Sequence, residues 1–415
     1  LLAMRVCDAE DSTPKQQMKQ KILSQLMRTK QIRLFIFLIV VTILILFGYT
    51  ALNCPSSICS INDIRKSIAA SVANYPVVRL IGSGINSSIY PSFEDVLKED
   101  FVFDIRGHDV IVFLHIQKTS GTSFGRHLVM DLNLERPCIC HRNKHKKRCE
   151  CFRPNKNDEH WLFSRYSTGW RCGLHADWTE LTNCVDETLN KYEGEAYPRR
   201  YFYITFLRDP VQRYLSEFQH VRRGATWKNS RHWCNGREAT ESELPTCYVG
   251  DNWEGVELHE FVTCPHNLAN NRQARMLANL ALVGCYNSSL MSENARNSII
   301  LKSAKENLKN MAFFGLTEFQ KISQYIFEET FNLRFTVTFS QSNDSHSSKV
   351  IDKISPKDLE DIQRVNALDI ELYNYAKDLL QERFELLKKS DVHFDDHYLH
   401  LGELPGSYFS WDDLE

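Results

Sequence analysis

The sequence lacks an internal repeat and lacks a strong net charge. Without a repeat of fixed period, solenoid and propeller architectures are excluded. The formal net charge is only −2, and it neither indicates nor excludes a polyanionic partner, because an average over the chain hides local charged patches. The 415 residues, 43% of them hydrophobic and 25% charged, suffice for a large folded domain together with additional segments.

Charge is also missing from residues 34–52, which predicts a single transmembrane helix. At a rise of about 1.5 Å per residue, a helix of this length covers a hydrocarbon core of about 30 Å. Lys and Arg precede the segment and none follows before Arg65, so the positive-inside rule places a tail, residues 1–33, in the cytosol and the bulk in the lumen. A cleaved signal peptide is the alternative, but the long basic lead and the missing small-residue cleavage site favour an uncleaved anchor.

The chain has 13 cysteines, many for a cytosolic enzyme, whereas in an oxidising lumen such a number indicates disulfides. With Cys7 set aside as cytosolic, an even number remains on the lumenal side, and their pairing cannot be read from spacing alone. Acceptor triplets for N-glycosylation begin at Asn86, Asn287 and Asn343, which fits an exposed lumenal domain.

Composition divides the lumenal part into a predicted stem (53–104), a folded domain (105–389) and an acidic, loose tail (390–415). Short apolar runs, each followed by a polar turn and a helical pattern, indicate an α/β fold with a central parallel sheet flanked by helices and with ligands at the carboxyl ends of the strands. The predicted strands are 110–114, 201–207 and 311–316, and the predicted helices are 257–282, 293–310, 317–331 with Thr317 as N-cap, and Ser355-Pro356 to about Lys389.

The stretch "IVFLHIQKTSGTSFGRHL", residues 111–128, reads as strand, small-residue turn and helix. It lacks the order of the common nucleotide-triphosphate loop, in which glycines precede the lysine. A helix starting near Ser123 would present free N–H groups and a positive dipole end to an anion. Lys118 adds a charge, and nearby hydroxyls add donors. We therefore predict an anion site here, against the alternative of a polar turn with an exposed lysine.

A second segment, "FLRDPVQRYLSEF", places Arg208 at a strand end. Asp209 suits the N-cap and Pro210 the first helical position. Arg208 is a candidate clamp for a phosphate, with Ser216, two turns into the helix, as a second donor. The alternative is an arginine that pairs with a neighbouring carboxylate.

The segment 138–153, "CICHRNKHKKRCECFR", has no acidic residue between Cys138 and Cys149 but many basic ones. In the cytosol this mixture of Cys and His would suggest zinc. In an oxidising lumen a basic hairpin closed by disulfides is favoured. The topology excludes nucleic acid, so the predicted partner is a sulfated or carboxylated polysaccharide. A merely solvated run of charge is the alternative.

His175 lies in "STGWRCGLHADW", between Trp170 and Trp178. A histidine can take a proton from a substrate hydroxyl near neutral pH. Since single histidines are more often structural, its surroundings alone leave both roles open.

Taken together, the chain resembles the heparan-sulfate 6-O-sulfotransferases. The resemblance covers about residues 110–340, in "FLHIQKTSGTSFGRHLV", "WLFSRYSTGWRCGLHADWTELTNC", "YFYITFLRDPVQRYLSEFQHVRRGATWK", "NLANNRQARMLA" and "MAFFGLTEFQKISQYIFEETFNLRF". It implies a P-loop-like sulfotransferase fold related to nucleotide kinases, the donor 3′-phosphoadenosine 5′-phosphosulfate (PAPS), and transfer to the 6-hydroxyl of glucosamine in heparan sulfate. It also implies a single-pass type II protein of the Golgi membrane.

The resemblance further implies roles for individual residues. It assigns the donor 5′-phosphosulfate to Lys118, Thr119, Ser120, Gly121, Thr122, Ser123, Phe124, Gly125 and Arg126, the 3′-phosphate to Arg208 and Ser216, closure over the nucleotide to Ser340, Gln341, Ser342, His346 and Ser347, the base to His175, and acceptor contacts to Lys146, Lys147, Trp170, His220 and Trp227. Ser120 replaces a glycine of the family. If that position needs a positive φ, Ser120 is strained, and if not, its hydroxyl adds a donor.

Sulfuryl transfer is an in-line displacement in which positioning and charge stabilisation do most of the work. A sulfuryl group carries less charge than a terminal phosphate, so we expect no metal requirement. His175 would take the hydroxyl proton and Lys118 would neutralise the leaving phosphate. A heparan-binding protein without activity, a sulfotransferase for another hydroxyl, and a kinase are the alternatives. The kinase is disfavoured by the order of the loop.

Overall fold

The computed structural model describes residues 89–98, 101–143, 146–194, 196–339 and 354–405, all within one compact unit, Gly84–Glu415. The predicted cytosolic tail, the anchor at 34–52 and most of the predicted stem lie outside these residues. Within the described ranges, no helix has the length and apolar character needed to cross a membrane.

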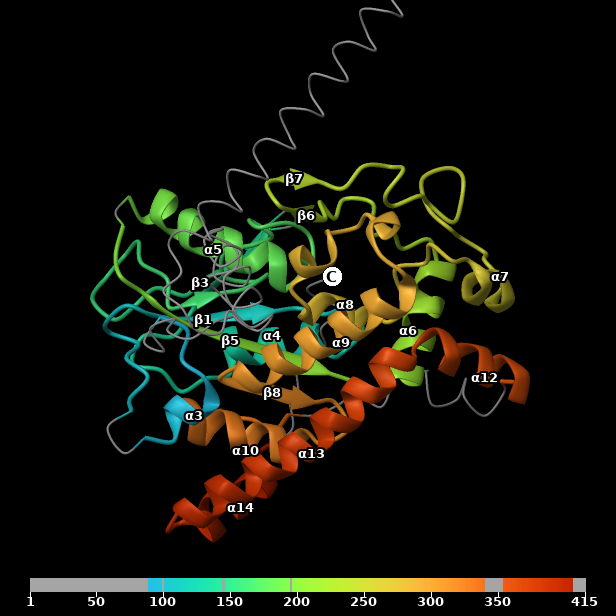
Figure 1. The fold of residues 1–415 in the computed structure, drawn as a ribbon. Coiled ribbons are helices and arrows are strands. Elements are labelled where there is room, and N and C mark those ends of the chain that lie inside the picture. Colours follow the sequence, from blue (N-terminus) through green and yellow to red (C-terminus); the bar gives the residue numbers. More distant parts are fainter. Residues whose placement is uncertain (1–88, 99–100, 144–145, 195, 340–353, 406–415) are drawn as a thin grey trace, which may run out of the picture. The chain divides into compact units, whose positions relative to one another are not determined.

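A four-stranded parallel sheet lies at the centre of the fold. Its order is β4 (Leu162–Phe163), β1 (Asp109–Leu114), β5 (Arg200–Leu207), β8 (Phe313–Leu316). β1, β4 and β8 are buried throughout, as is β5 after its first residue, which explains why they read as continuous apolar runs. Figure 1 shows β1, β5 and β8 side by side, with α10, α13 and α14 beyond β8. The three predicted strands are confirmed, whereas β4 is too short to be recognised from its pattern.

Helices follow the strands and cover the sheet. α4 (Gly121–Met130) follows β1, α6 (Pro210–Arg222) follows β5, and α10 (Gln320–Phe331) follows β8. The predicted caps of α6 are confirmed, since Asp209 accepts a hydrogen bond from the Gln212 N–H and Pro210 opens the helix. The other helices are α3 (Phe93–Val96), α5 (Trp178–Glu193), α7 (Leu258–Thr263), α8 (Arg272–Leu277), η2 (Leu280–Val283), η3 (Ser288–Leu290), α9 (Glu293–Asn310), α12 (Pro356–Val365), α13 (Ala367–Ser390) and α14 (Phe394–Glu403).

Three helix predictions need correction, while the helix predicted over 293–310 is confirmed as α9. The region 257–282 is not one helix, because α7 ends at Thr263, two residues before Pro265. The helix α8 starts only after Asn271, which is left-handed at φ 46°. Thr317 is not an N-cap, since α10 begins at Gln320. The long C-terminal helix is interrupted at Asn366, between α12 and α13.

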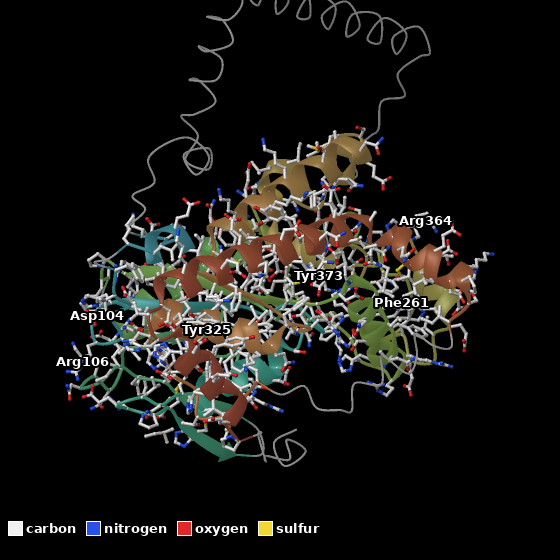
Figure 2. All side chains as sticks on the ribbon, turned by 90° about the horizontal axis from the view of Figure 1, so that it is seen from below. Asp104, Arg106, Phe261, Tyr325, Arg364 and Tyr373 are labelled. Carbon is white, nitrogen blue, oxygen red and sulfur yellow. A yellow bond between two sulfur atoms is a disulfide. The ribbon has the colours of Figure 1, made fainter. Side chains whose placement is uncertain are left out.

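The folded domain begins earlier than residue 105 and extends beyond residue 389. Phe93 in α3 and Phe103, both within the predicted stem, are buried in the core, and Phe103 stacks edge-to-face on Phe202 with ring centroids 5.2 Å apart. At the other end, α14 lies in the predicted loose tail. Tyr325 of α10, labelled in Figure 2, packs edge-to-face against Phe394 of α14 at 5.3 Å.

A second cluster of buried side chains fixes the direction of α6. Tyr214 and Phe218 of α6 pack against Phe261 of α7, which is labelled in Figure 2. Ile362 of α12 is fully buried in the same cluster. Since α6 follows β5, this packing determines where the residues on its first turns lie.

Disulfides secure the loops outside the sheet. The basic segment forms the predicted hairpin, β2 (Ile139–Asn143) and β3 (Lys146–Glu150), closed by two disulfides. The zinc alternative is therefore excluded for its four cysteines. The disulfides of the described residues are Cys138–Cys151, Cys140–Cys149, Cys172–Cys184, Cys234–Cys285 and Cys247–Cys264.

Candidate active site

The loops after the strands meet at one edge of the sheet, the carboxyl edge where ligands bind in open α/β folds. The Arg208 guanidinium, just after β5, donates to the backbone oxygen of Lys118, after β1, at 3.4 Å. The Thr317 hydroxyl, after β8, donates to the backbone oxygen of Thr119 at 3.0 Å. The predicted donor loop, residues 118–126, is thus held by residues that follow β5 and β8.

The donor loop has an unusual backbone. Lys118 and Ser120 both take left-handed conformations, with φ of 65° and 63°. Ser120 is the N-cap of α4, but its side chain makes no capping hydrogen bond. The first-turn N–H groups of α4 therefore point out of the helix without an internal acceptor, as in known anion sites. Because Ser120 has a positive φ, the strained alternative for this residue is the one that holds.

Not every residue of the predicted donor loop presents its side chain. The Thr119 hydroxyl donates to the Ile116 carbonyl oxygen at 3.1 Å, and Thr119 is fully buried. Phe124 lies in the core against Phe206, with ring centroids 4.5 Å apart. The Phe124 N–H already donates to the Ser120 oxygen. The groups of the loop that remain suited to an anion are therefore the N–H groups that precede Phe124 and the polar side chains other than that of Thr119.

The side chain of Gln273 holds the backbone of Arg208 in place. The Arg208 N–H donates to the side-chain oxygen of Gln273 at 2.9 Å, and the Gln273 amide donates back to the Arg208 oxygen at 2.9 Å. Burial lowers the pKa of Arg208, partly offset by Glu318. Ser216, on α6, is half-buried. Both residues predicted for the 3′-phosphate thus follow β5, on the segment that adjoins the donor loop.

His175 lies across from the loop and its tautomer is determined by a backbone contact. Its Nδ1 is 3.0 Å from the carbonyl oxygen of His115. A carbonyl oxygen only accepts, so Nδ1 carries the proton and Nε2 of the neutral ring carries the lone pair. His175 itself has a positive φ of 52°, a conformation that is common at functional sites. The helix α5 begins three residues later, with Asp177 as its cap.

The pKa of His175 is far below that of an ordinary histidine. Burial lowers it to about 3, and the nearby Arg272 and Arg165 act in the same direction against the hydrogen bond to the His115 carbonyl. The ring is therefore neutral over the whole physiological range. A neutral imidazole with its Nε2 lone pair available is the form that a general base requires.

Aromatic side chains surround His175. The ring of Trp170 lies 4.6 Å from that of His175 and the ring of Trp227 lies 5.1 Å from it, edge-to-face. His220 packs on Trp227 at 5.5 Å. Of the predicted acceptor residues, Trp170 and Trp227 therefore adjoin the predicted base, and His220 adjoins Trp227.

A buried ion cluster holds Trp227 in place. The Trp227 indole N–H donates to Glu217 at 3.1 Å, and Glu217 is also paired with Arg213 and Arg272. Burial would raise the pKa of Glu217, but Arg272 and Arg213 outweigh it and hold the pKa at about 2. The carboxylate is thus ionised and fully engaged. A second tether, from the Ser230 hydroxyl to the Leu174 oxygen at 3.0 Å, joins the Trp227 loop to the His175 loop.

Some predicted site residues cannot be placed in full. Lys146 and Lys147 belong to β3 by their backbone, while their side chains lie outside the described part of the structure. The hairpin contacts the segment that follows β4, because the Cys149 N–H donates to the backbone oxygen of Tyr166 at 2.7 Å. The predicted closing residues, Ser340, Gln341, Ser342, His346 and Ser347, lie outside the described residues.

Arg165 belongs to the site and was not anticipated. It follows the short strand β4, and its guanidinium lies 3.4 Å from the Thr122 hydroxyl and 5.7 Å from the centre of the Trp170 ring. Arg165 therefore lies between the donor loop and Trp170. The signal for it is weak, because β4 has only two residues and a lone arginine after it has no recognisable pattern.

Comparison with known proteins shows the family to which the chain belongs. A model of the sulfotransferase family matches residues 102–376. Heparan-sulfate 6-O-sulfotransferase 3-B of Danio rerio is 57% identical over 71% of this chain and 69% of its own length. Heparan-sulfate 6-O-sulfotransferase 3 of Mus musculus is 58% identical over 72% of the chain and 64% of its own length. Heparan-sulfate 6-O-sulfotransferase 2 of Gallus gallus is 51% identical over 85% and 88%. The chain belongs to the heparan-sulfate 6-O-sulfotransferase family of sulfotransferases.

Proposed function

We propose that this protein transfers a sulfuryl group from PAPS to the 6-hydroxyl of glucosamine residues in heparan sulfate. The observation that carries the proposal is the pair formed by a neutral His175, with its Nε2 lone pair available, and the cationic loop at Lys118 across the same sheet edge. The names of the relatives supply the substrate class.

The chemistry uses both sides of the site. The acceptor oxygen attacks sulfur, the bond between sulfur and the 5′-phosphate oxygen breaks, and its electron pair leaves with that phosphate. The hydroxyl proton passes to Nε2 of His175. Lys118 and the first-turn N–H groups of α4 balance the charge that develops on the leaving phosphate and the sulfuryl oxygens. Arg208 and Ser216 hold the 3′-phosphate, which aligns the donor for in-line attack.

We expect the reaction to need no metal ion, because the charge to be neutralised is smaller than in phosphoryl transfer and the loop supplies a lysine and helix N–H groups. In the described part of the chain, the group of side chains best suited to hold a metal is Glu329, Asp391 and His397. It lies on α10, beyond α13 and on α14, outside the donor loop and the His175 loop.

The acceptor side fits a sulfated or carboxylated polysaccharide. Trp170 and Trp227 provide flat apolar surfaces for sugar rings beside His175. The basic hairpin, which adjoins Tyr166, would extend the contact along the polysaccharide, and Lys146 and Lys147 are the residues proposed to bind its anionic groups. Disulfides are formed in oxidising compartments. We therefore also propose a type II protein of the Golgi membrane, anchored by residues 34–52.

The deciding experiment is incubation of the lumenal domain with labelled PAPS and N-sulfated heparan precursor, followed by disaccharide analysis. The expected product carries the new sulfate on the glucosamine 6-oxygen. New sulfate at another position would instead identify a sulfotransferase for a different hydroxyl. No incorporation, together with no binding to immobilised 3′,5′-adenosine bisphosphate, would identify a heparan-binding protein without activity.

Two substitutions test the assigned roles. We expect His175→Ala and Lys118→Ala each to lower the rate by about a hundredfold to a thousandfold, as for loss of one transition-state group, while folding and heparin binding persist. Circular dichroism and heparin-column retention provide the controls. Turnover close to that of the unchanged protein would remove the residue from the mechanism.

A further inference from the structure

A second histidine, His115, lies between the predicted base and the donor loop. It directly follows β1, and its ring is 5% exposed. The ring lies edge-to-face against His175, with centroids 4.8 Å apart, and is stacked on Trp170 at 5.7 Å. Its backbone oxygen accepts the Nδ1 proton of His175. His115 therefore contacts both the predicted base, His175, and the predicted acceptor residue Trp170.

The same ring lies directly on the donor loop. A methyl group placed on Gly121 would lie 2.3 Å from Cδ2 and 2.6 Å from Nε2 of His115. Gly121 is the first residue of α4, the helix whose N-terminus faces the anion. Only a glycine leaves room for the imidazole there, so the absence of a side chain at residue 121 serves the approach of His115 to the loop.

The two ring nitrogens of His115 have different environments. Nδ1 is buried and has no hydrogen-bond partner among the described residues. Nε2 lies on the opposite edge of the ring, toward Gly121 in the donor loop. Nε2 is thus the nitrogen that a ligand seated on the loop can reach.

These environments select one tautomer. A proton on Nδ1 would be a buried donor without an acceptor, and such orphaned N–H groups are rarer in proteins than unsatisfied acceptors. The proton of the neutral ring therefore belongs on Nε2. Burial keeps the pKa of His115 well below its ordinary value, with His175, Arg165 and Lys118 acting in the same direction, so the ring remains neutral.

We propose that His115 is a catalytic hydrogen-bond donor whose Nε2–H binds an oxygen of the sulfuryl group during transfer. The inference rests on the proposed function, because it takes the transferred group to pass between the Gly121 edge of the loop and His175. The two imidazoles then hold opposite tautomers: His175 accepts the hydroxyl proton at Nε2, and His115 donates a hydrogen bond from Nε2. No proton leaves His115 at any step.

Substitution of His115 tests this role. His115→Phe keeps the stacked ring and removes the donor, His115→Gln places an amide N–H near the position of Nε2, and His115→Asn places one near Nδ1. We expect kcat to fall about a hundredfold to a thousandfold for the Phe variant, with the Gln variant at least tenfold faster than the Asn variant. The dissociation constant of 3′,5′-adenosine bisphosphate should change less than threefold. His127→Phe, which removes a buried histidine at the other end of α4, is the matched control, with kcat within about threefold.

The outcomes separate the inference from the proposed function. If the unchanged protein forms labelled 6-O-sulfate and His115→Phe retains kcat within threefold, the role of His115 is wrong and the function stands. If the Phe variant does not fold, the Gln and Asn variants decide, and equal rates for these two overturn the inference. If the unchanged protein transfers no sulfate, the proposed function itself fails.

Discussion

The low pKa of His175 has a measurable consequence for the pH dependence of the enzyme. A histidine with an ordinary pKa of about 6.5 would be neutral in about 76% of molecules at pH 7 and in about 3% at pH 5. A base of that kind would lose about 25-fold in rate between these values. With a pKa of about 3, the ring is about 99% neutral at pH 5. We therefore expect the rate of the enzyme to change by less than about twofold between pH 7 and pH 5.

The assay is kcat/KM for PAPS from pH 7 to pH 5, because this parameter reports ionisations of the free enzyme. The 3′-phosphate of the donor also titrates near pH 6, so the affinity for 3′,5′-adenosine bisphosphate is measured over the same range and used as a correction. A corrected fall of about 25-fold with a midpoint near 6.5 would refute the assignment of a desolvated, neutral base.

The stability of the protein, unlike its rate, should depend on pH over this range. Below pH 6.5 the unfolded chain protonates His175 while the folded protein does not until about pH 3, so the unfolded state binds more protons and stability falls as pH falls. Between pH 7 and pH 5 the protonation of His175 in the unfolded chain should lower the free energy of unfolding by about 2 kcal/mol. Urea unfolding of the unchanged protein and of His175→Gln at both pH values isolates the effect. An unchanged difference between the two proteins would contradict it.

Three further predictions concern stability. Ser120→Gly should raise the free energy of unfolding by up to about 1 kcal/mol, because glycine removes the left-handed strain at this residue. The greater chain entropy of glycine in the unfolded state cancels part of this gain. A loss of stability in urea titration would show that Ser120 is not strained. Removal of the Cys234–Cys285 disulfide by double Ala substitution should lower the free energy of unfolding by about 4 kcal/mol, because this disulfide closes a loop with a sequence separation of 51. A calorimetric change under 1 kcal/mol would show that loop closure does not stabilise the protein as expected. Glu217→Gln should lower the free energy of unfolding by about 3–5 kcal/mol, because it leaves the buried charge of Arg272 without its partner. No effect on thermal unfolding would contradict an ionised Glu217 in this cluster.

Local patterns were sufficient for the parts of the fold that depend on neighbouring residues. β1, β5 and β8 are buried, and buried parallel strands have an apolar signature. The caps of α6 could be predicted because Asp209 and Pro210 act within one turn. By contrast, the break at Asn271 depends on contacts with α13, where the Asn271 side-chain oxygen accepts from the Leu368 N–H at 2.9 Å. A contact between residues so far apart in sequence cannot be predicted from the residues next to Asn271.

The candidate site shows the same division. Lys118, Arg208 and His175 were predicted, because each lies in a stretch whose residue types resemble a known family. Their joint geometry was not, since it depends on contacts such as that between Arg208 and the Lys118 oxygen, 90 residues apart in sequence. Arg165 was missed for a related reason, as a strand of two residues carries no periodicity.

Phe93 and Phe103, which come before the sheet in the chain yet lie in its core, limit where this protein can be cut. Removal of a buried phenylalanine side chain typically costs about 3–5 kcal/mol. A version starting at residue 105 would lose both rings and the contact between Phe103 and Phe202. Cleavage that leaves the core complete therefore has to occur upstream of Phe93.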